Sequence, residues 1–301
     1  MRRSRLALCA PVLFALAPVT ASAALFVDTF DNAGSSSQWL ITTAAAGGAG
    51  DTTIFGFDYS TKGVPEAPNT PLGAAPTRGL FLQTNKGLAT GVINGLNVTA
   101  ASGGVAINFP QDALRVSFDM WLGVPSELTS TTEQALFGIN TDGVGVNSRT
   151  GATQTGADGV WYHMANEGGY GNTSTTPNSR DYVNYIDNTV VGRLDNGEEP
   201  FLSNFPNGPL AGAIGNSWVQ VVIEEIGNNV RLSFNGVTIF DVPNAGPTSG
   251  SIFLGYQDPF SGSIGDAQAL FGLFDNVQVV PEPTSLALLG AAGLLGLRRR
   301  R

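Results

Sequence analysis

The sequence predicts an all-β sandwich, because apolar residues alternate with polar ones, turn residues recur between these runs, and helical periodicity is scarce. Leu114, Val116 and Phe118 share one face of an extended segment, whereas Arg115 and Ser117 lie on the other. The chain contains 39 glycines, and Gly, Ser, Thr and Asn fill the segments between the alternating runs. Many short strands joined by such segments are typical of two sheets packed face to face.

The expected strands follow from this alternation, taken in chain order. They are residues 25–30, 79–84, 105–109, 114–122, 135–140, 159–165, 181–186, 218–226, 230–234, 237–242, 251–256 and 269–280. Asn235-Gly236 separates two of these strands and is a strong signal for a two-residue hairpin turn. Gly227-Asn228 joins another pair in a similar way. Long loops are expected at residues 44–76, 141–157 and 188–216.

The N-terminal end has the three parts of a secretory signal peptide. Three arginines open the chain, residues 6–19 are apolar, and Ala21-Ser22-Ala23 offers the small residues that a signal peptidase reads. A buried N-terminal helix is the alternative, but Pro11 and Pro18 would break it. We therefore expect signal peptidase to cleave after Ala23, which leaves an exported mature chain.

The C-terminal end carries a second pattern related to export. Pro281, Glu282 and Pro283 precede an apolar run at residues 285–297, which is closed by the basic residues Arg298, Arg299, Arg300 and Arg301. Arginines after an apolar segment stay on the cytoplasmic side, so the preceding domain would lie across the membrane. The run is shorter than the roughly 20 residues of a full span. This length favours a transient handle for a processing enzyme over a permanent transmembrane helix.

The order of Pro-Glu-Pro, short apolar segment and basic end resembles the PEP-CTERM sorting signal. The resemblance covers residues 280–301 and implies an exosortase in the membrane that processes the tail. It also implies a Gram-negative bacterium with an exopolysaccharide-rich envelope, but nothing about the activity of the sorted domain. An amphipathic or disordered tail is the alternative.

The expected regions are a signal peptide at 1–23, one sandwich domain at 24–280 and a sorting signal at 281–301.

The charge of the expected domain differs from that of the whole chain. The whole chain has 15 basic and 24 acidic residues, but seven arginines and Glu282 belong to the two end segments. Residues 24–280 keep 8 basic and 23 acidic residues, a formal net charge of −15. Such a surface repels nucleic acid and anionic lipid, and favours cations or neutral glycans as partners. High solubility alone is the simpler explanation of the charge.

The cysteine content excludes two kinds of chemistry. Cys9 is the only cysteine and lies in the expected signal peptide. The mature chain therefore has no internal disulfide, and no thiolate for catalysis or zinc.

Several short motifs resemble the second half of a concanavalin A-like, laminin-G-type jelly roll. They lie at residues 216–220, 230–237, 250–256 and 274–279, and the opening residues 26–31 also suit that family. The resemblance implies a jelly-roll β-sandwich. It implies no single function, because this fold hosts lectins, glycanases and structural modules.

The sequence contains no recognisable catalytic constellation. Glycanases on such sandwiches use two carboxylates about 5–10 Å apart, commonly from alternate positions of one strand, and that pattern is missing here. Glu224 and Glu225 are adjacent, so they point to opposite faces of a strand. Glu198 and Glu199 lie in an expected turn. His163 is the only histidine, and we expect a structural role for it.

Asp31 and Asp275 form the one metal site that the sequence suggests. They lie near the two ends of the expected domain, and the first and last strands of jelly-roll modules commonly pair. With backbone carbonyls and water, the two carboxylates would suit Ca²⁺, which prefers oxygen ligands. The alternative is a pair of turn-capping aspartates. No cofactor other than this structural ion is expected.

Trp161 and Tyr170 are the candidate carbohydrate-binding residues. An aromatic ring presents an apolar face with a polar edge, which suits a pyranose, and the glycines on either side of Tyr170 favour its exposure. Most aromatic residues of a sandwich, however, belong to its core or to cross-strand pairs.

These observations predict an exported, exosortase-sorted protein of the cell surface or extracellular matrix. We expect it to be non-enzymatic and to bind polysaccharide, with exopolysaccharide as the partner that the sorting signal implies. We expect contact with the membrane only through the C-terminal segment before processing. The alternative is a polysaccharide-degrading hydrolase or lyase on the same scaffold, since a lyase that uses Tyr with Arg or His leaves little trace in a sequence.

Overall fold

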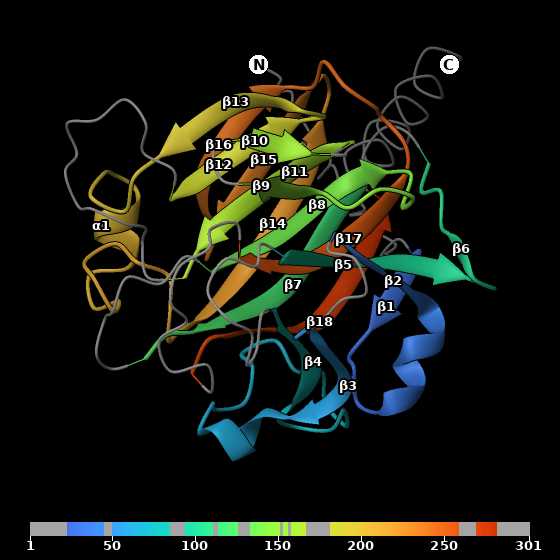
Figure 1. Ribbon diagram of the computed structural model, residues 1–301, viewed down its shortest axis with the longest axis vertical. Helices are drawn as coiled ribbons and strands as arrows, with labels where there is room; N and C mark the ends of the chain where they lie inside the picture. The colour runs from blue at the N-terminus through green and yellow to red at the C-terminus, as the bar shows by residue number, and fades with distance from the viewer. Residues whose placement is uncertain are drawn as a thin grey trace, which may run out of the picture. The chain divides into compact units, whose positions relative to one another are not determined.

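Two antiparallel β-sheets dominate the part of the chain that the structure describes (Figure 1). The computed structural model describes residues 23–44, 50–84, 94–110, 114–125, 133–150, 153–155, 158–166, 181–258 and 269–281. Over these residues, the expected all-β sandwich of two antiparallel sheets is confirmed.

The first sheet places the last described strand near its centre. Its strands are β1 (Phe26–Asp28), β3 (Thr52–Asp58), β4 (Arg78–Gln83), β7 (Leu114–Gly123), β14 (Trp218–Ile226), β15 (Asn229–Phe234), β16 (Val237–Pro243) and β18 (Phe271–Pro281). They follow the order β16–β15–β14–β7–β18–β4–β3, and β1 pairs with β18 beside this path. The expected pairing of the first and last strands is thus confirmed, with Phe26 opposite Val279 (blue β1 and red β18 in Figure 1).

The second sheet is built from the remaining long strands. They are β2 (Trp39–Thr43), β5 (Asn94–Ser102), β8 (Gln134–Thr141), β11 (Val160–Ala165), β12 (Tyr182–Ile186), β13 (Thr189–Leu194) and β17 (Ser251–Asp258). Their order is β13–β12–β11–β8–β17–β5–β2, and the short β6 (Val105–Ala106) pairs with β5. A separate hairpin is formed by β9 (Ser148–Thr150) and β10 (Thr153–Thr155).

Helical structure is minor among the described residues. It consists of the 3-10 helices η1 (Ala33–Gln38) and η2 (Tyr59–Lys62) and the single-turn helix α1 (Phe201–Asn204). None of the described helices is both long enough and apolar enough to pass through a membrane.

The structure corrects several sequence-based boundaries. The expected loop 44–76 contains β3, the expected loop 141–157 contains β9 and β10, and the expected loop 188–216 contains β13 and α1. Strands β2 and β5 lie where no strand is predicted. β5 pairs with β17 on one side and with β2 on the other, and its side chains are buried along nearly its whole length. A strand buried on both faces needs no polar–apolar alternation, so the periodicity does not reveal it.

The core lies between the two sheets and is rich in aromatic rings. Phe118 of β7 packs edge to face on Phe137 of β8, with ring centroids 5.4 Å apart. Phe137 also lies 6.5 Å from Phe234 of β15. The alternation predicted for β7 is confirmed, since Val116 and Phe118 are both 2 % exposed. Burial of each such side chain contributes about 1.5–3 kcal/mol.

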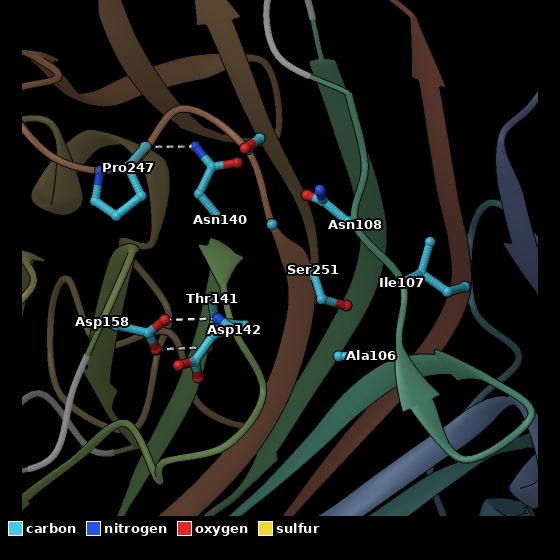
Figure 2. A pocket seen from close by; sticks show the side chains of 11 residues that line it. Ala106, Ile107, Asn108, Asn140, Thr141, Asp142, Asp158, Pro247 and Ser251 are labelled. Carbon is cyan, nitrogen blue, oxygen red and sulfur yellow. Dashed lines mark hydrogen bonds between the residues drawn. The ribbon is translucent and has the colours of Figure 1, made fainter.

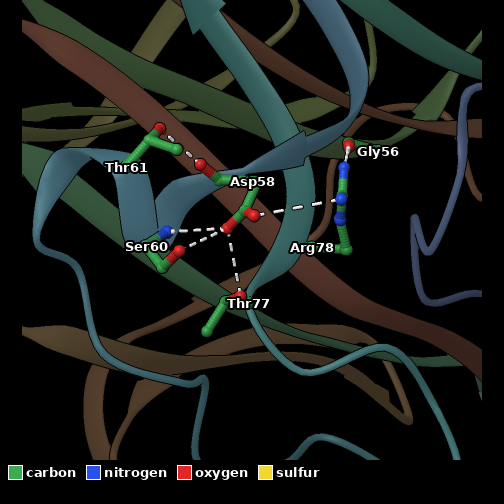
Figure 3. A network of polar contacts seen from close by, with 6 residues as sticks. All are labelled: Gly56, Asp58, Ser60, Thr61, Thr77 and Arg78. Carbon is green, nitrogen blue, oxygen red and sulfur yellow. Dashed lines mark hydrogen bonds and ion pairs between the residues drawn. The ribbon is translucent and has the colours of Figure 1, made fainter.

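A hydrogen-bond network closes the base of the segment 59–77, which connects β3 to β4 (Figure 3). Asp58 Oδ1 accepts hydrogen bonds from Ser60 Oγ at 2.6 Å and Thr77 Oγ1 at 3.2 Å, which joins the two ends of the segment. Arg78 donates to Gly56 O at 2.8 Å and lies 3.9 Å from the Asp58 carboxylate. The hydrogen bond from Ser60 is the main cause that lowers the pKa of Asp58.

Candidate functional site

The segment 59–77 contacts two buried aspartates on neighbouring strands of the first sheet. Asp119 of β7 and Asp275 of β18 lie opposite each other and are 0 % and 1 % exposed. Asn69 donates to Asp119 through its backbone N–H at 3.2 Å and its Nδ2 at 2.6 Å. The Tyr59 hydroxyl donates to Asp275 at 3.0 Å. These hydrogen bonds hold the segment on the outer face of the sheet.

Burial shifts the pKa of both aspartates. It raises the pKa of Asp119. It also raises the pKa of Asp275 to about 8, and the negative charges of Asp119 and Asp31 add to that rise. Asp275 is therefore largely protonated at neutral pH unless a cation compensates its charge.

The structure brings the predicted calcium ligands into electrostatic range of each other. Asp31 follows β1 and accepts a hydrogen bond from Ala75 N at 3.1 Å, and its charge contributes to the raised pKa of Asp275. Asn276 donates its Nδ2 to Asp119 at 2.9 Å, while its amide oxygen is buried without a hydrogen-bond partner. Carboxylate and amide oxygens are the ligands that Ca²⁺ prefers, so this donor set fits the ion.

The carboxylates do not form a complete metal site by themselves. Over the described ranges, no three His, Cys, Asp or Glu side chains are grouped closely enough to hold a metal ion. A Ca²⁺ ion beside Asp275 would therefore need amide or backbone oxygens as well. Sequence reasoning missed Asp119, although the alternation of β7 places it on the polar face of that strand. Its burial depends on the segment 59–77, which no local pattern reveals.

Trp161, predicted to bind carbohydrate, is buried on the outer face of the second sheet. Its ring stacks on Tyr185 with centroids 3.9 Å apart and planes 9° apart. Its Nε1 donates to Asp187 O at 2.8 Å. With an exposure of 0 %, Trp161 does not present the open ring face that a sugar platform requires. Tyr170, the second candidate, lies outside the described residues.

His163 lies beside Trp161 on the same face and is fully buried. Its Nδ1 is 3.0 Å from the Tyr185 hydroxyl, and the tautomer decides which of the two groups donates. An amide network continues along this face, where Gln257 donates to Gln134 at 2.6 Å and accepts from Arg149 N at 2.8 Å. The outer face of the second sheet thus holds a Tyr–His pair next to amide groups.

A pocket of about 400 Å³ lies where β8 ends and β11 and β17 begin (Figure 2). Asp142 and Asp158 supply carboxylates to its lining, and Asn108 supplies an amide. Ile107 and Pro247 add apolar surface. The sequence does not reveal this pocket, because its residues come from four separate segments of the chain.

The Asp158 carboxylate organises one side of this pocket. It accepts hydrogen bonds from Thr141 Oγ1 at 2.6 Å and from Asp142 N at 2.5 Å (Figure 2). Burial raises the pKa of Asp158, and the negative charges of Asp142 and Asp187 add to the rise. The pocket is therefore electronegative when its carboxyl groups are ionised.

The glutamates considered for catalysis have separate structural contacts. Glu224 forms a salt bridge with Arg115, whereas Glu225 is buried and accepts a hydrogen bond from β8. The prediction that these two side chains point to opposite faces is confirmed. Glu198 and Glu199 accept hydrogen bonds within the turn around α1.

The structure describes only part of the predicted processing sites. Ala23 is exposed and precedes β1, and Pro281 is the last residue of β18, opposite Leu114. The remaining predicted residues lie outside the described ranges; they are Glu282, Pro283, Arg298, Arg299, Arg300 and Arg301.

Three solved structures illustrate what the chain is similar to. A protein of unknown function with a galectin-like fold from Bacillus subtilis is 11% identical, with 87% of this chain and 97% of that chain covered and a TM-score of 0.46. The Ca²⁺-bound exoplasmic/lumenal domain of VIP36 is 9% identical, with 85% and 88% covered and a TM-score of 0.47. The carbohydrate-binding module CBM66 from Bacillus subtilis is 10% identical, with 78% and 98% covered and a TM-score of 0.36.

The sequence comparisons concern the C-terminal end. No curated protein sequence matches the chain. Residues 279–301 match the family model of the PEP-CTERM protein-sorting motif, which includes Pro281, Glu282 and Pro283 and the four final arginines. The predicted sorting signal is thus confirmed, and the chain is one that carries the PEP-CTERM protein-sorting motif at its C-terminal end.

Proposed function

We propose that this protein is a non-enzymatic component of the cell surface or extracellular matrix that binds neutral polysaccharide through the pocket at the end of β8. The sorting motif at residues 279–301 supports delivery to the surface by an exosortase. The chemistry of the pocket is the observation that supports polysaccharide as the ligand.

The pocket combines the two features that a sugar ring requires. Asp142, Asp158 and Asn108 offer hydrogen-bonding groups for hydroxyls, and bonds to ionised carboxylates are the stronger ones. Ile107 and Pro247 offer apolar surface for the C–H face of a ring. The volume of about 400 Å³ lies within the usual range for small-ligand pockets.

The charge of the domain favours a neutral ligand over an acidic one. The formal net charge of −15 over residues 24–280 repels uronate- or sulfate-bearing chains, as do the two carboxylates of the pocket. We therefore expect hydroxyl-rich polysaccharides without acidic groups to bind best.

Binding is measured with the processed protein on an array of neutral and acidic glycans, followed by calorimetric titration of the hits. Asp142→Ala should weaken binding about tenfold, since it removes a charged hydrogen-bond acceptor worth about 1.5 kcal/mol or more. Glu66→Ala is the matched control, because Glu66 is an exposed carboxylate outside this pocket, and it should leave the affinity unchanged. Retention of acidic glycans only, or equal affinity of the Asp142→Ala variant, would contradict the proposal.

A polysaccharide lyase is the second candidate, and the Tyr185–His163 pair is the observation that favours it. A tyrosine hydroxyl 3.0 Å from an imidazole nitrogen lies within the distance at which a proton can be transferred between them. Both side chains are buried, so activity would require the covering residues to move. The glycans that bind on the array are incubated with the protein, and unsaturated and reducing sugar products are then measured. Product formation by the wild-type protein that Tyr185→Phe abolishes would favour the lyase over the binding protein.

A further inference from the structure

The sorting motif begins inside the folded sandwich. The family match starts at residue 279, whereas β18 extends to Pro281, so the first three matched residues are part of a strand. Val279 lies opposite Val116 of β7 on one side and opposite Phe26 of β1 on the other. This part of the motif is thus a central strand of the first sheet and not a free linker.

The end of β18 is held in the sheet by a buried side chain and by backbone pairing with its neighbours. Val279 is 0 % exposed and packs in the core between the sheets. Leu25 donates its backbone N–H to Val279 O at 2.8 Å. Pro281 continues the ladder opposite Leu114. Releasing the end of β18 would therefore break backbone hydrogen bonds and withdraw a buried valine from the core.

The same pairing places Ala23 and Pro281 at one end of two neighbouring strands. Ala23, after which signal peptidase is expected to cleave, lies two residues before Leu25. Pro281 lies two residues after Val279, to which Leu25 is hydrogen bonded. Strand β1, which follows the expected signal peptidase site, therefore pairs with β18, which leads into the Pro-Glu-Pro motif.

We propose that pairing of the C-terminal end of β18 with β1 and β7 gates the processing of the sorting tail. An enzyme that cuts a chain must bind the backbone around the cut in its own cleft, which a paired and buried strand does not allow. The sorting enzyme reaches residues 279–281 before β1 and β7 have paired with β18, or when this end of the sheet opens. Once the sandwich is complete, the pairing of β18 slows the processing of the tail.

The test compares three full-length chains in a host that contains an exosortase. The first is the wild type, and the second carries Gly-Ser-Gly-Ser between Val280 and Pro281, a flexible spacer that separates Pro281 and the residues after it from the paired part of β18. The third carries the same insertion between Gly227 and Asn228, in the β14–β15 turn, as the matched control. Mass spectrometry gives the fraction of chains that have lost the tail at a fixed time after synthesis, and melting curves verify that each chain folds.

A processed fraction at least twice that of the wild type in the spacer variant, with no change in the turn control, supports the gate. An equal or lower fraction overturns it, and so does the absence of processing in all three chains. Hydrogen exchange provides a second measurement on the unprocessed wild type. The amides of Val279 and Val280 should exchange as slowly as core amides, and exchange at the rate of an unfolded chain would also overturn the proposal. None of these outcomes depends on polysaccharide binding.

Discussion

Among the individual residues, Asp119 and Asp275 owe their chemistry to burial beneath the segment 59–77. On an open sheet, both carboxylates would be ionised and hydrated at neutral pH. Here they are almost fully buried and accept hydrogen bonds from Asn69 and Tyr59, respectively. Their raised pKa values reflect the cost of ionising carboxyl groups that burial shields from water. A bound cation or bound protons would offset that cost.

Removal of calcium is expected to destabilise the protein. An ion that binds only the folded state at a hundred times its Kd contributes about 2.7 kcal/mol, so a chelator should lower the Tm by about 5–10 °C. Asp275→Asn and Asp31→Asn should each abolish most of that response, because they remove a charge while keeping the shape. Asp241→Asn, at the exposed ion pair with Arg231, is the control and should keep the response. If chelation leaves the wild-type melting curve unmoved, the two aspartates are turn and strand residues only.

In the presence of a chelator, stability should fall as the pH rises from about 4 to about 8. Burial raises the pKa of Asp275 to about 8 and, with the charge of Asp195, that of Asp181 to about 7, from an ordinary value of 3.8. In this window the folded chain binds more protons than the unfolded chain, so each rise in pH favours unfolding. The stabilisation is complete below pH 4 and lost above pH 8.

Thermal melts over this pH range measure the slope. Asp275→Asn should flatten it, because the variant has no proton to lose at that position. Asp241→Asn should leave the slope unchanged, since the hydrogen bond from Arg231 lowers the pKa of Asp241 and places its titration below the window. A wild-type Tm that is constant or rises between pH 5 and pH 8 would contradict the assignment of raised pKa values.

Among the strands, turns with positive φ determine which segments pair. The predicted hairpin at Asn235-Gly236 is confirmed, with φ of 50° and 80° at the two turn residues, and Phe234 lies opposite Val237. Asn235 Oδ1 also accepts a hydrogen bond from Gln220 N at 2.9 Å, which ties the turn to β14. The turn at Gly227-Asn228 likewise joins β14 to β15. Together these two turns set the register of three consecutive strands.

The Asn235-Gly236→Ala-Ala variant should lose about 2 kcal/mol of unfolding free energy, because alanine adopts positive φ only at a cost of about 1–2 kcal/mol. No atom lies within 4 Å of a Cβ built on Gly236, so crowding does not contribute there. Urea unfolding gives the free energy. In Asn235→Gly, glycine adopts the positive φ without strain, and only the acceptor for Gln220 N is lost. This variant should therefore lose less unfolding free energy than Ala-Ala. Unfolding midpoints that are equal for wild type and Ala-Ala would contradict the role of this turn.

At the scale of the whole molecule, the first and last described strands of the sandwich pair with each other. The strand that follows the predicted signal peptide pairs with the strand that enters the sorting motif. The chain therefore completes its first sheet from segments at opposite ends of the mature sequence. Such long-range pairing forms late because a long loop must close first. Under the proposed gate, residues 279–281 are therefore still unpaired during early folding.

Processing of the native protein is expected at both ends. The mature N-terminus should be Ala24, following the Ala21-Ser22-Ala23 site, and the tail should be lost near residues 281–283. Intact-mass measurement of protein from an exosortase-containing host checks both ends, and the same measurement in a host that lacks the enzyme is the control. A mature species that still carries Arg298 to Arg301 in the exosortase-containing host would contradict the interpretation of the tail.

The sequence by itself determined the features that depend on local order. The alternation of β7 and the Asn235-Gly236 turn predict all-β structure, since side-chain period and turn conformation are properties of neighbouring residues. The Pro-Glu-Pro motif, the apolar run and the arginines predict sorting because an enzyme reads them as a linear segment. The pairing of the first and last strands was predicted only through a family resemblance.

Only the tertiary structure decided which polar and aromatic groups are buried. Alternation assigns Asp119 to the outer face of β7, where a side chain is expected to be exposed, but Asp119 is buried. Trp161 lies on the outer face of the second sheet, where a sugar-binding ring would have to be exposed, but it is also buried. Segment 59–77 covers Asp119, and the ring of Trp161 stacks on the ring of Tyr185. The pocket around Asp158 likewise unites segments that are distant in sequence. Burial and pocket formation depend on which distant segments come together, and no local period encodes that information.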